Sequence, residues 1–202
     1  MPSITQTQGD FFQASIDNAQ RQISRYLKEE RIAPGDARLI GEFLAERRAA
    51  GGISPRRGDK LVYTLMGWRR FLPPFDTLTL TMVYNGIEAI KHAEYRQNRP
   101  FKQNTLFDSV AILKQFLLWM IENDYSELPE KKIKGIKTPR KDAKTKTASQ
   151  LLTPDEIQVL IKASRSSRDR AMLMTLYEGG FRPGEICQLA WGDMRPLRKG
   201  SR

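Results

Sequence analysis

The sequence predicts an all-α protein, and three observations lead to this fold class. Apolar residues recur every three or four positions as far as about Trp191, which is the spacing of one helix face. Helix-capping residues and Ser-Pro or Thr-Pro pairs precede several of these periodic segments, and Gly-Gly or Pro-Pro pairs follow others. The apolar residues do not alternate with polar ones as they do in a half-buried strand. A helical architecture follows.

Two amphipathic helices are expected at the start of a first domain over residues 15–130. The first runs from about residue 16 to residue 32 and ends at Pro34-Gly35. Asp36 can cap the second, which closes at Gly51-Gly52. The side chains expected to face inward are Ile16, Ala19, Ile23, Tyr26 and Leu27 from the first helix, and Leu39, Ile40, Phe43 and Leu44 from the second.

Three further helices complete this bundle. Ser54-Pro55 opens one, since Ser is a good cap and Pro suits the first helical position. After Pro73-Pro74, Thr79 or Thr81 can cap a helix that reaches about Tyr95, and Asn104 or Thr105 starts the most apolar one. The expected inward side chains are Leu61, Leu65, Trp68, Leu72, Val110, Leu113, Phe116, Leu117, Trp119 and Met120. Such a bundle can form its own core, and residues 1–14 are expected to be a flexible amino terminus.

A strongly basic segment follows the bundle. The stretch KKIKGIKTPRKDAKTK, residues 131–146, has eight Lys or Arg residues and one Asp, with almost nothing to bury. We interpret residues 131–150 as an interdomain linker. It is either a solvated connector or a strand that lies along a DNA backbone, where each neutralised phosphate releases counterions.

The overall composition limits the function classes. The net charge of +11 favours a polyanionic partner, with nucleic acid first and an anionic membrane surface second. No apolar run approaches the length of a membrane span, and the start MPSITQTQGD lacks the features of a secretory signal, so a cytosolic protein is expected. The single cysteine, Cys187, excludes an internal disulfide and a multi-cysteine zinc site, and no metal or cofactor is expected.

Residues 151–202 are expected to form a second unit of capped helices. Thr153 and Glu156 form a capping box around Pro154, and a further helix runs from about Arg168 to Glu178. Gly179-Gly180 ends that helix with a left-handed turn.

The turn after this diglycine carries the residues best suited to chemistry. Pro183 fits the first position of a new helix, so Arg182 is expected at its cap, between two helices. There the guanidinium can bind an oxyanion that the helix amino terminus also favours. Glu185 is placed either to hold Arg182 or to cap the helix, and spacing alone does not decide between the two.

The segments LLTPDEIQVLIKAS and RDRAMLMTLYEGGFRPGEICQLAWGDM resemble the opening of a tyrosine recombinase (phage integrase) catalytic domain. The family motif joins a Gly, an apolar residue, Arg, two variable residues and Glu to an apolar helix and a Trp-x-Asp turn. Its elements are present at Gly180, Phe181, Arg182, Glu185, Leu189, Trp191 and Asp193. LLTPDEI and RDRA are similar to archaeal members. Upstream, ILKQFLLWMIENDYSELP resembles the last helix of the family's SAM-like core-binding domain.

The resemblance implies a site-specific recombinase in which Arg182 binds the scissile phosphate and Glu185 supports it. Its partners would be double-stranded DNA and other recombinase protomers, with no membrane. The family also needs a hairpin lysine, a His-x-x-Arg motif, a late His or Trp and a nucleophilic tyrosine, and these are not found after Arg182. We therefore expect a truncated catalytic domain, and a polypeptide limited to DNA binding.

Other chemistry-bearing residues receive structural interpretations. Tyr177 precedes Arg182 and is expected in the core, and His92 is expected to be an ordinary helix residue. Cys187 is expected to be a small apolar filler. The predicted DNA-binding residues are Lys137, Arg140, Lys141, Lys144 and Lys146 from the linker and Arg56, Arg57 and Lys60 from the bundle. The last three form a cluster with Arg69 and Arg70 near one helix, and this cluster either contacts DNA or is a solvated face.

Two alternative functions remain open from the sequence. One is a non-catalytic DNA-binding regulator or decoy of recombination, and the other is a helical protein-interaction module whose charge keeps it soluble.

Overall fold

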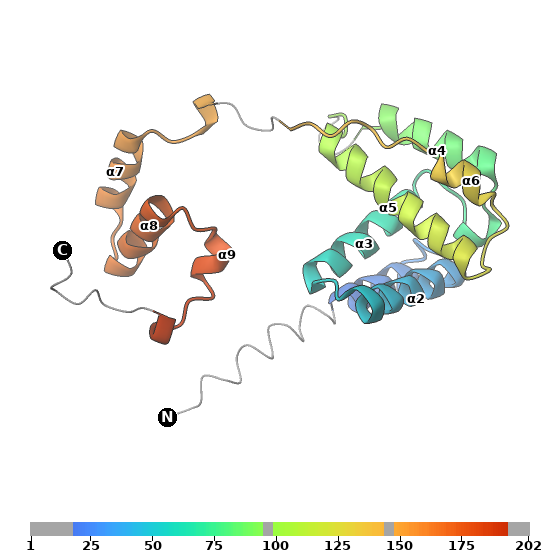
Figure 1. Ribbon diagram of the computed structural model, residues 1–202, viewed down its shortest axis with the longest axis horizontal. Coiled ribbons are helices and arrows are strands. Elements are labelled where there is room, and N and C mark those ends of the chain that lie inside the picture. Colours follow the sequence, from blue (N-terminus) through green and yellow to red (C-terminus); the bar gives the residue numbers. More distant parts are fainter. Residues whose placement is uncertain (1–17, 95–98, 144–147, 194–202) are drawn as a thin grey trace. The chain divides into compact units, whose positions relative to one another are not determined.

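The computed structural model describes residues 18–94, 99–143 and 148–193, and it shows an all-α protein (Figure 1). Within these residues the only extended pairing is an isolated bridge between Glu94 and Pro100. The chain divides into two compact units, Met1–Ala143 and Lys144–Arg202. The predicted fold class is therefore confirmed.

The described part of the first unit starts within a helix that ends at residue 28, followed by α2, Pro34–Gly51. Pro34 does not end the first helix, as the sequence suggested, because it occupies the first turn of α2. Asp36 does serve the start of α2, but from its third position, where its Oδ2 accepts the amide of Ala33 at 3.3 Å. α2 ends as predicted, with Gly52 in the left-handed region at φ 55°.

The next two helices begin at the predicted caps. α3, Pro55–Trp68, starts at Ser54, whose hydroxyl accepts the amide of Arg57 at 3.3 Å. A short 3-10 turn, η1 (Phe75–Thr77), leads to α4, Leu80–His92. Thr79 rather than Thr81 caps α4, by accepting the amide of Met82 at 3.4 Å. α4 ends at His92, with Ala93 in an extended conformation, so it stops slightly before the predicted end near Tyr95.

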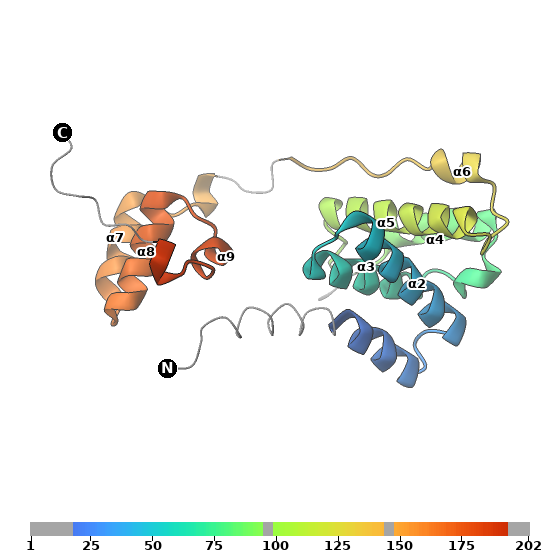
Figure 2. The ribbon, with the colours of Figure 1, turned by 60° about the horizontal axis from the view of Figure 1, so that its bottom comes forward.

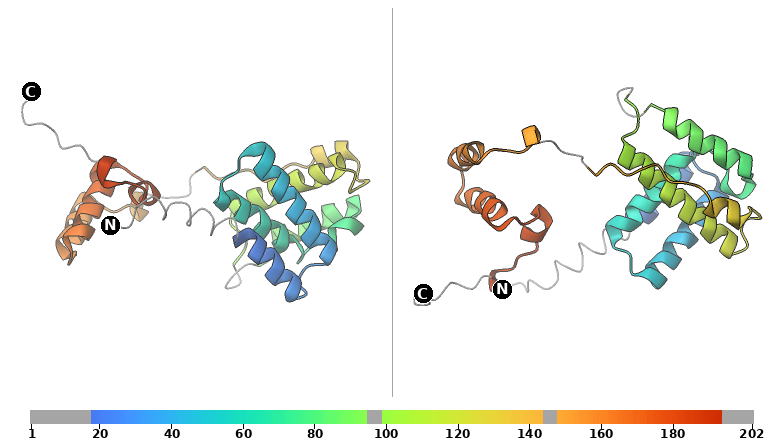
Figure 3. Two further views of the ribbon diagram at one scale, coloured as in Figure 1. Left: turned by 90° about the horizontal axis from the view of Figure 1, so that it is seen from below. Right: turned by 45° about the horizontal axis from the view of Figure 1, so that its top comes forward.

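The longest helix of the first unit, α5 (Gln103–Glu122), crosses α3 and packs against α6, Glu130–Lys134. Its first residue is Gln103, slightly ahead of the expected Asn104 or Thr105. In two views the segment after α6 runs back along α5 toward its amino terminus (Figure 1; Figure 3, right).

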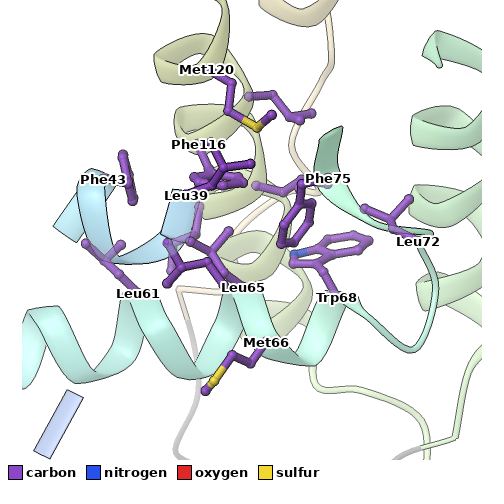
Figure 4. Packing of buried hydrophobic residues seen from close by; sticks show 14 of the residues in the cluster. Leu39, Phe43, Leu61, Leu65, Met66, Trp68, Leu72, Phe75, Phe116 and Met120 are labelled. Carbon is purple, nitrogen blue, oxygen red and sulfur yellow. The ribbon is translucent and has the colours of Figure 1, made fainter. Parts of the chain in front are cut away.

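One hydrophobic core holds the first unit together. Figure 4 shows its centre, where Phe43 of α2, Trp68 of α3, Phe75 of η1 and Phe116 of α5 converge. Phe116 packs edge-on against both Phe43 and Phe75, with ring centroids 5.3 and 5.0 Å apart. Every inward side chain predicted for α2, α3 and α5 is buried. In the first helix Ala19 and Tyr26 are buried, whereas Leu27 is exposed and Ile16 lies outside the described residues.

The first part of the basic segment belongs to the first unit, whereas the sequence predicted a linker from residue 131. Residues 130–134 form α6, and Ile133 is completely buried while Ile136 packs against the core. The expectation of a linker with almost nothing to bury was wrong for this part, because two isoleucines three residues apart give the segment an apolar face. The division between the units falls after Ala143.

The second unit consists of short, capped helices (Figure 2, orange to red): α7 (Pro154–Ala163), α8 (Ser167–Gly179) and the single-turn α9 (Pro183–Ile186). 3-10 turns flank them at η3 (Ala148–Gln150) and η4 (Trp191–Asp193). The capping box predicted at Thr153 and Glu156 is present, with each accepting the other's amide. No side chain described in this unit is buried, and the large apolar side chains left exposed are Leu151, Leu152, Val159, Leu160, Met172, Met174, Tyr177, Phe181 and Leu189.

Candidate functional site

The exposed face of α3 carries two basic residues, a tyrosine and a glycine. Arg56, Lys60, Tyr63 and Gly67 follow one another at intervals of four, three and four, which places them on one side of the helix. Arg70 follows in the turn after Trp68, the last residue of α3. All five are exposed, and a Cβ added to Gly67 would meet nothing within 4 Å. Of the predicted DNA-binding residues in this region, Arg56 and Lys60 therefore lie on an open face, while Arg57 is half-buried.

Arg69 belongs to the interior instead. Its side chain is only 16% exposed and forms an ion pair with the fully buried carboxylate of Asp36. The grouping of Arg69 with the solvent-facing basic residues was therefore wrong. Arg69 is the C-cap of α3 and Arg70 is the next residue of the turn; Arg69 turns inward, whereas Arg70 faces solvent.

The basic segment after α6 presents three further candidate residues. Lys137, Arg140 and Lys141 are exposed, whereas Lys144 and Lys146 lie outside the described residues. The backbone here is held by side chains of α5. Gln103 donates to the carbonyl of Arg140 at 2.9 Å, and Asn104 donates to the carbonyl of Asp142 at 3.0 Å.

Lys60 and Lys141 are far apart in the sequence, but each contacts one of two consecutive residues of α5. Lys60 of α3 pairs with Asp108, and the ammonium of Lys141 lies 5.6 Å from the ring centre of Phe107. The first two turns of α5 thus connect the basic face of α3 with the basic segment. We call the set Arg56, Lys60, Lys137, Arg140 and Lys141 the basic surface.

This arrangement is suited to binding phosphates. Its cations are exposed, so they keep their hydration and can exchange counterions for phosphate oxygens. Among the described residues, Asp108 is the carboxylate that forms an ion pair with a member of the basic surface. Within the described ranges, no group of three or more His, Cys, Asp or Glu residues is arranged to hold a metal ion.

The second unit places Arg182 at a defined turn. α8 ends at Gly180, whose φ of 62° is a left-handed conformation that glycine adopts without strain. A Cβ on Gly179 would lie 2.3 Å from Cε2 of Phe181, so the ring of Phe181 occupies the space that only glycine leaves open. Both glycines therefore shape the turn that precedes Arg182.

Arg182 is the N-cap of α9, as predicted, and Glu185 contacts it in two ways. Oε2 of Glu185 accepts the amide of Arg182 at 2.7 Å, and Oε1 pairs with the guanidinium Nη1 at 3.3 Å. Glu185 therefore both caps the helix and holds the arginine. The guanidinium side chain remains 86% exposed, so it is open to a further anionic ligand.

The helix that follows Arg182 is shorter than the motif suggested. α9 covers only Pro183–Ile186, and a single turn adds little macrodipole. Anion binding here would therefore depend on the guanidinium itself. Asp193 closes the Trp-x-Asp turn by accepting the amide of Ala190 at 2.8 Å.

Of the structural interpretations made for Cys187, Tyr177 and His92, the first two were wrong. Cys187 and Tyr177 are exposed, so the predictions that they fill a core were wrong for the described structure. None of the side chains of α8 is buried, and Cys187 is the C-cap of the single-turn α9, which also has no buried residue. His92 is an exposed residue in the last turn of α4, where Nε2 lies 3.2 Å from Oε1 of Glu88.

The sequence did not identify the residues that hold the basic segment. Gln103, Asn104 and Lys114 carry no motif, and their role depends on contacts with residues far along the chain. Tyr63 and Gly67 could have been found from their spacing on α3.

Residues 150–200 match the model of the phage integrase family. Neither the search of curated proteins nor that of solved structures found a match. The described residues include no helix that is both long enough and apolar enough to cross a membrane.

Proposed function

We propose that the chain is a recombinase polypeptide that binds duplex DNA, because residues 150–200 match the model of the phage integrase family. In this proposal the first unit, including its basic segment, binds the DNA backbone, and Arg182 binds one phosphodiester group. The observation that carries it is the convergence of Lys60 and Lys141 on the start of α5.

The charge distribution supports contact with a phosphate backbone. The basic surface combines five exposed cations from α3 and the segment after α6, and the chain as a whole has a net charge of +11. Such contacts position a protein on DNA without reading bases. The exposed Tyr63 on the same face of α3 can contact a sugar or a base edge between them.

The geometry of Arg182 supports a role in holding a phosphate at a fixed place. Its backbone is set by the left-handed Gly180 before it and by the cap from Glu185 after it. A positioned guanidinium can form two parallel bonds to phosphate oxygens and offset the charge that develops in phosphoryl transfer.

A salt titration of duplex binding tests the proposal. The affinity should fall linearly with salt on a log–log plot, because each neutralised phosphate contributes about 0.9 to the slope. Changing Lys137, Arg140 and Lys141 together to Gln should reduce the slope by about 2.7, if each makes one contact. The charge-matched control changes Lys28, Lys91 and Lys162, exposed residues outside the basic surface. Equal losses in both triple variants would mean that net charge alone drives binding.

A further inference from the structure

The side-chain amide of Asn104 binds both backbone polar groups of Asp142, in the basic segment. Its Nδ2 donates to the carbonyl oxygen of Asp142 at 3.0 Å, and its Oδ1 accepts the amide of the same residue at 2.8 Å. A side-chain amide that satisfies a donor and an acceptor of one residue holds that residue in a single register. Gln103 adds a third bond, to the carbonyl of Arg140 at 2.9 Å.

Lys114 holds the other end of the same segment. Its ammonium group donates to the carbonyl oxygens of Lys134 and Ile136, at 2.6 and 3.0 Å. These carbonyls lie at and just after the end of α6, where a helix leaves backbone acceptors without partners and where a positive charge is favourable. The buried Ile133 fixes α6 itself on the core.

The segment between these two attachments carries the exposed cations. Lys137, Arg140 and Lys141 lie between Ile136, held by Lys114, and Asp142, held by Asn104. Pro139 and Thr138 within it are half-buried, and Pro139 restricts the backbone further. Ordering a flexible basic chain on DNA costs conformational entropy, and a segment held before binding avoids part of that cost.

We infer that Asn104 is a positioning residue for DNA binding: it keeps residues 137–142 against α5, so that their cations meet phosphates in a fixed register. This inference rests on the proposed DNA-binding function. Asn104 is uncharged, so its effect on DNA affinity would come through the segment that it holds.

The test compares Asn104→Ala with Gln115→Ala, a control on an exposed position of the same helix. Three quantities are measured on the full chain: hydrogen exchange of the Asp142 amide, affinity for a duplex of random sequence as a function of salt, and thermal unfolding. Lys114→Met serves as a second variant, because it removes the ammonium donors and keeps most of the aliphatic stem. Lys91→Met controls for its lost charge.

Asn104→Ala should expose the Asp142 amide to exchange and lower the duplex affinity by about tenfold, which corresponds to about 1.4 kcal/mol at 25 °C. Its salt slope should also fall, while the unfolding temperature stays close to that of the unchanged chain. Gln115→Ala should change none of these. Lys114→Met should lower the affinity more than Lys91→Met.

Three results would overturn the inference. The Asp142 amide could keep its protection in Asn104→Ala, which would mean that the segment is held by other contacts. The protection could be lost with no change in duplex affinity, which would leave the proposed DNA binding intact and remove the role of Asn104. Finally, the unchanged chain could fail to bind duplex DNA, which would defeat the proposed function together with this inference.

Discussion

Asp36 and Arg69 form an ion pair in the interior of the first unit. Oδ2 of Asp36 lies 2.7 Å from Nε of Arg69, and the carboxylate is fully buried. The same carboxylate accepts the amide of Phe75 at 2.8 Å and the amide of Ala33 at 3.3 Å. Asp36 therefore ties the start of α2 to the end of α3 and to η1.

Replacement of Asp36 by Ala should destabilise the first unit by about 3–5 kcal/mol, because it leaves the charge of Arg69 without its partner in a mostly buried place. It also leaves the amides of Ala33 and Phe75 without their acceptor. Urea unfolding followed by tryptophan fluorescence measures the change. Asp76→Ala, on an exposed residue of η1, is the control and should stay within about 0.5 kcal/mol. A loss in Asp36→Ala no larger than in this control would show that the pair does not stabilise the fold.

Replacement of Asp108 by Asn should strengthen duplex binding by about twofold to fivefold at low salt. The change removes a negative charge beside the basic surface and releases Lys60 from its ion pair. Surface pairs of this kind are worth about 0.2–1 kcal/mol, and salt screens them. Fluorescence anisotropy with a labelled duplex measures the affinity. Glu88→Gln removes the same charge on α4, where its partners are Lys91 and His92, and should have a smaller effect. If the two variants behaved alike, Asp108 would have no special place near the DNA.

The start of α7 should lose stability on acidification. The amide and hydroxyl of Thr153 donate to Glu156 and hold its pKa below the usual value of 4.5. Because the pKa is lower in the folded state, this stabilisation is complete above the unfolded pKa and is lost as the pH falls through the folded one. Carbon-13 shifts of the Glu156 carboxyl give the folded pKa, and amide shifts of residues 153–156 follow the cap. Glu156→Gln should remove this pH dependence. A folded pKa at or above 4.5 would contradict the assignment.

Local signals in the sequence predicted local structure well. Ser54, Thr79 and Thr153 cap the helices that follow them, because a cap depends on residues within one turn. The apolar spacing of α5 likewise identified its buried face. Pro34 was misinterpreted because the same residue can end one helix or open the next, and only the conformation of its neighbours distinguishes the two cases.

Contacts between distant residues could not be predicted in this way. Nothing in the composition of the basic segment shows that Ile133 reaches the core or that Asn104 binds Asp142. Arg69 and Arg70 are equivalent in sequence, and the buried Asp36 decides which of them turns inward. The turn that holds Arg182 was predictable because Gly180 and Glu185 are its near neighbours.

The two units should differ in their resistance to hydrogen exchange. In the described residues, 27 hydrophobic side chains are buried, and all of them lie in the first unit, between Ala19 and Ile133. α7, α8 and α9 contain none. Slow exchange requires buried, cooperative structure. Amides of α3 and α5 should therefore exchange slower than those of α7 and α8 by roughly two orders of magnitude or more. Mass spectrometry of exchanged peptides measures this difference, and similar protection in both units would contradict it.

Arg182 should contribute more to DNA binding than another exposed arginine of the same unit. Arg168 is the matched control, since its side chain is 89% exposed and pairs with Asp169, while that of Arg182 is 86% exposed and pairs with Glu185. Arg182→Ala should reduce the salt slope by about 0.9, the contribution of one phosphate contact, and Arg168→Ala should leave it unchanged. Arg182→Lys keeps the charge and loses the planar fork, so it should restore the slope but only part of the affinity. Equal effects of the two alanine variants would mean that Arg182 acts only through its charge, and the assignment of a phosphate site to this turn would fail.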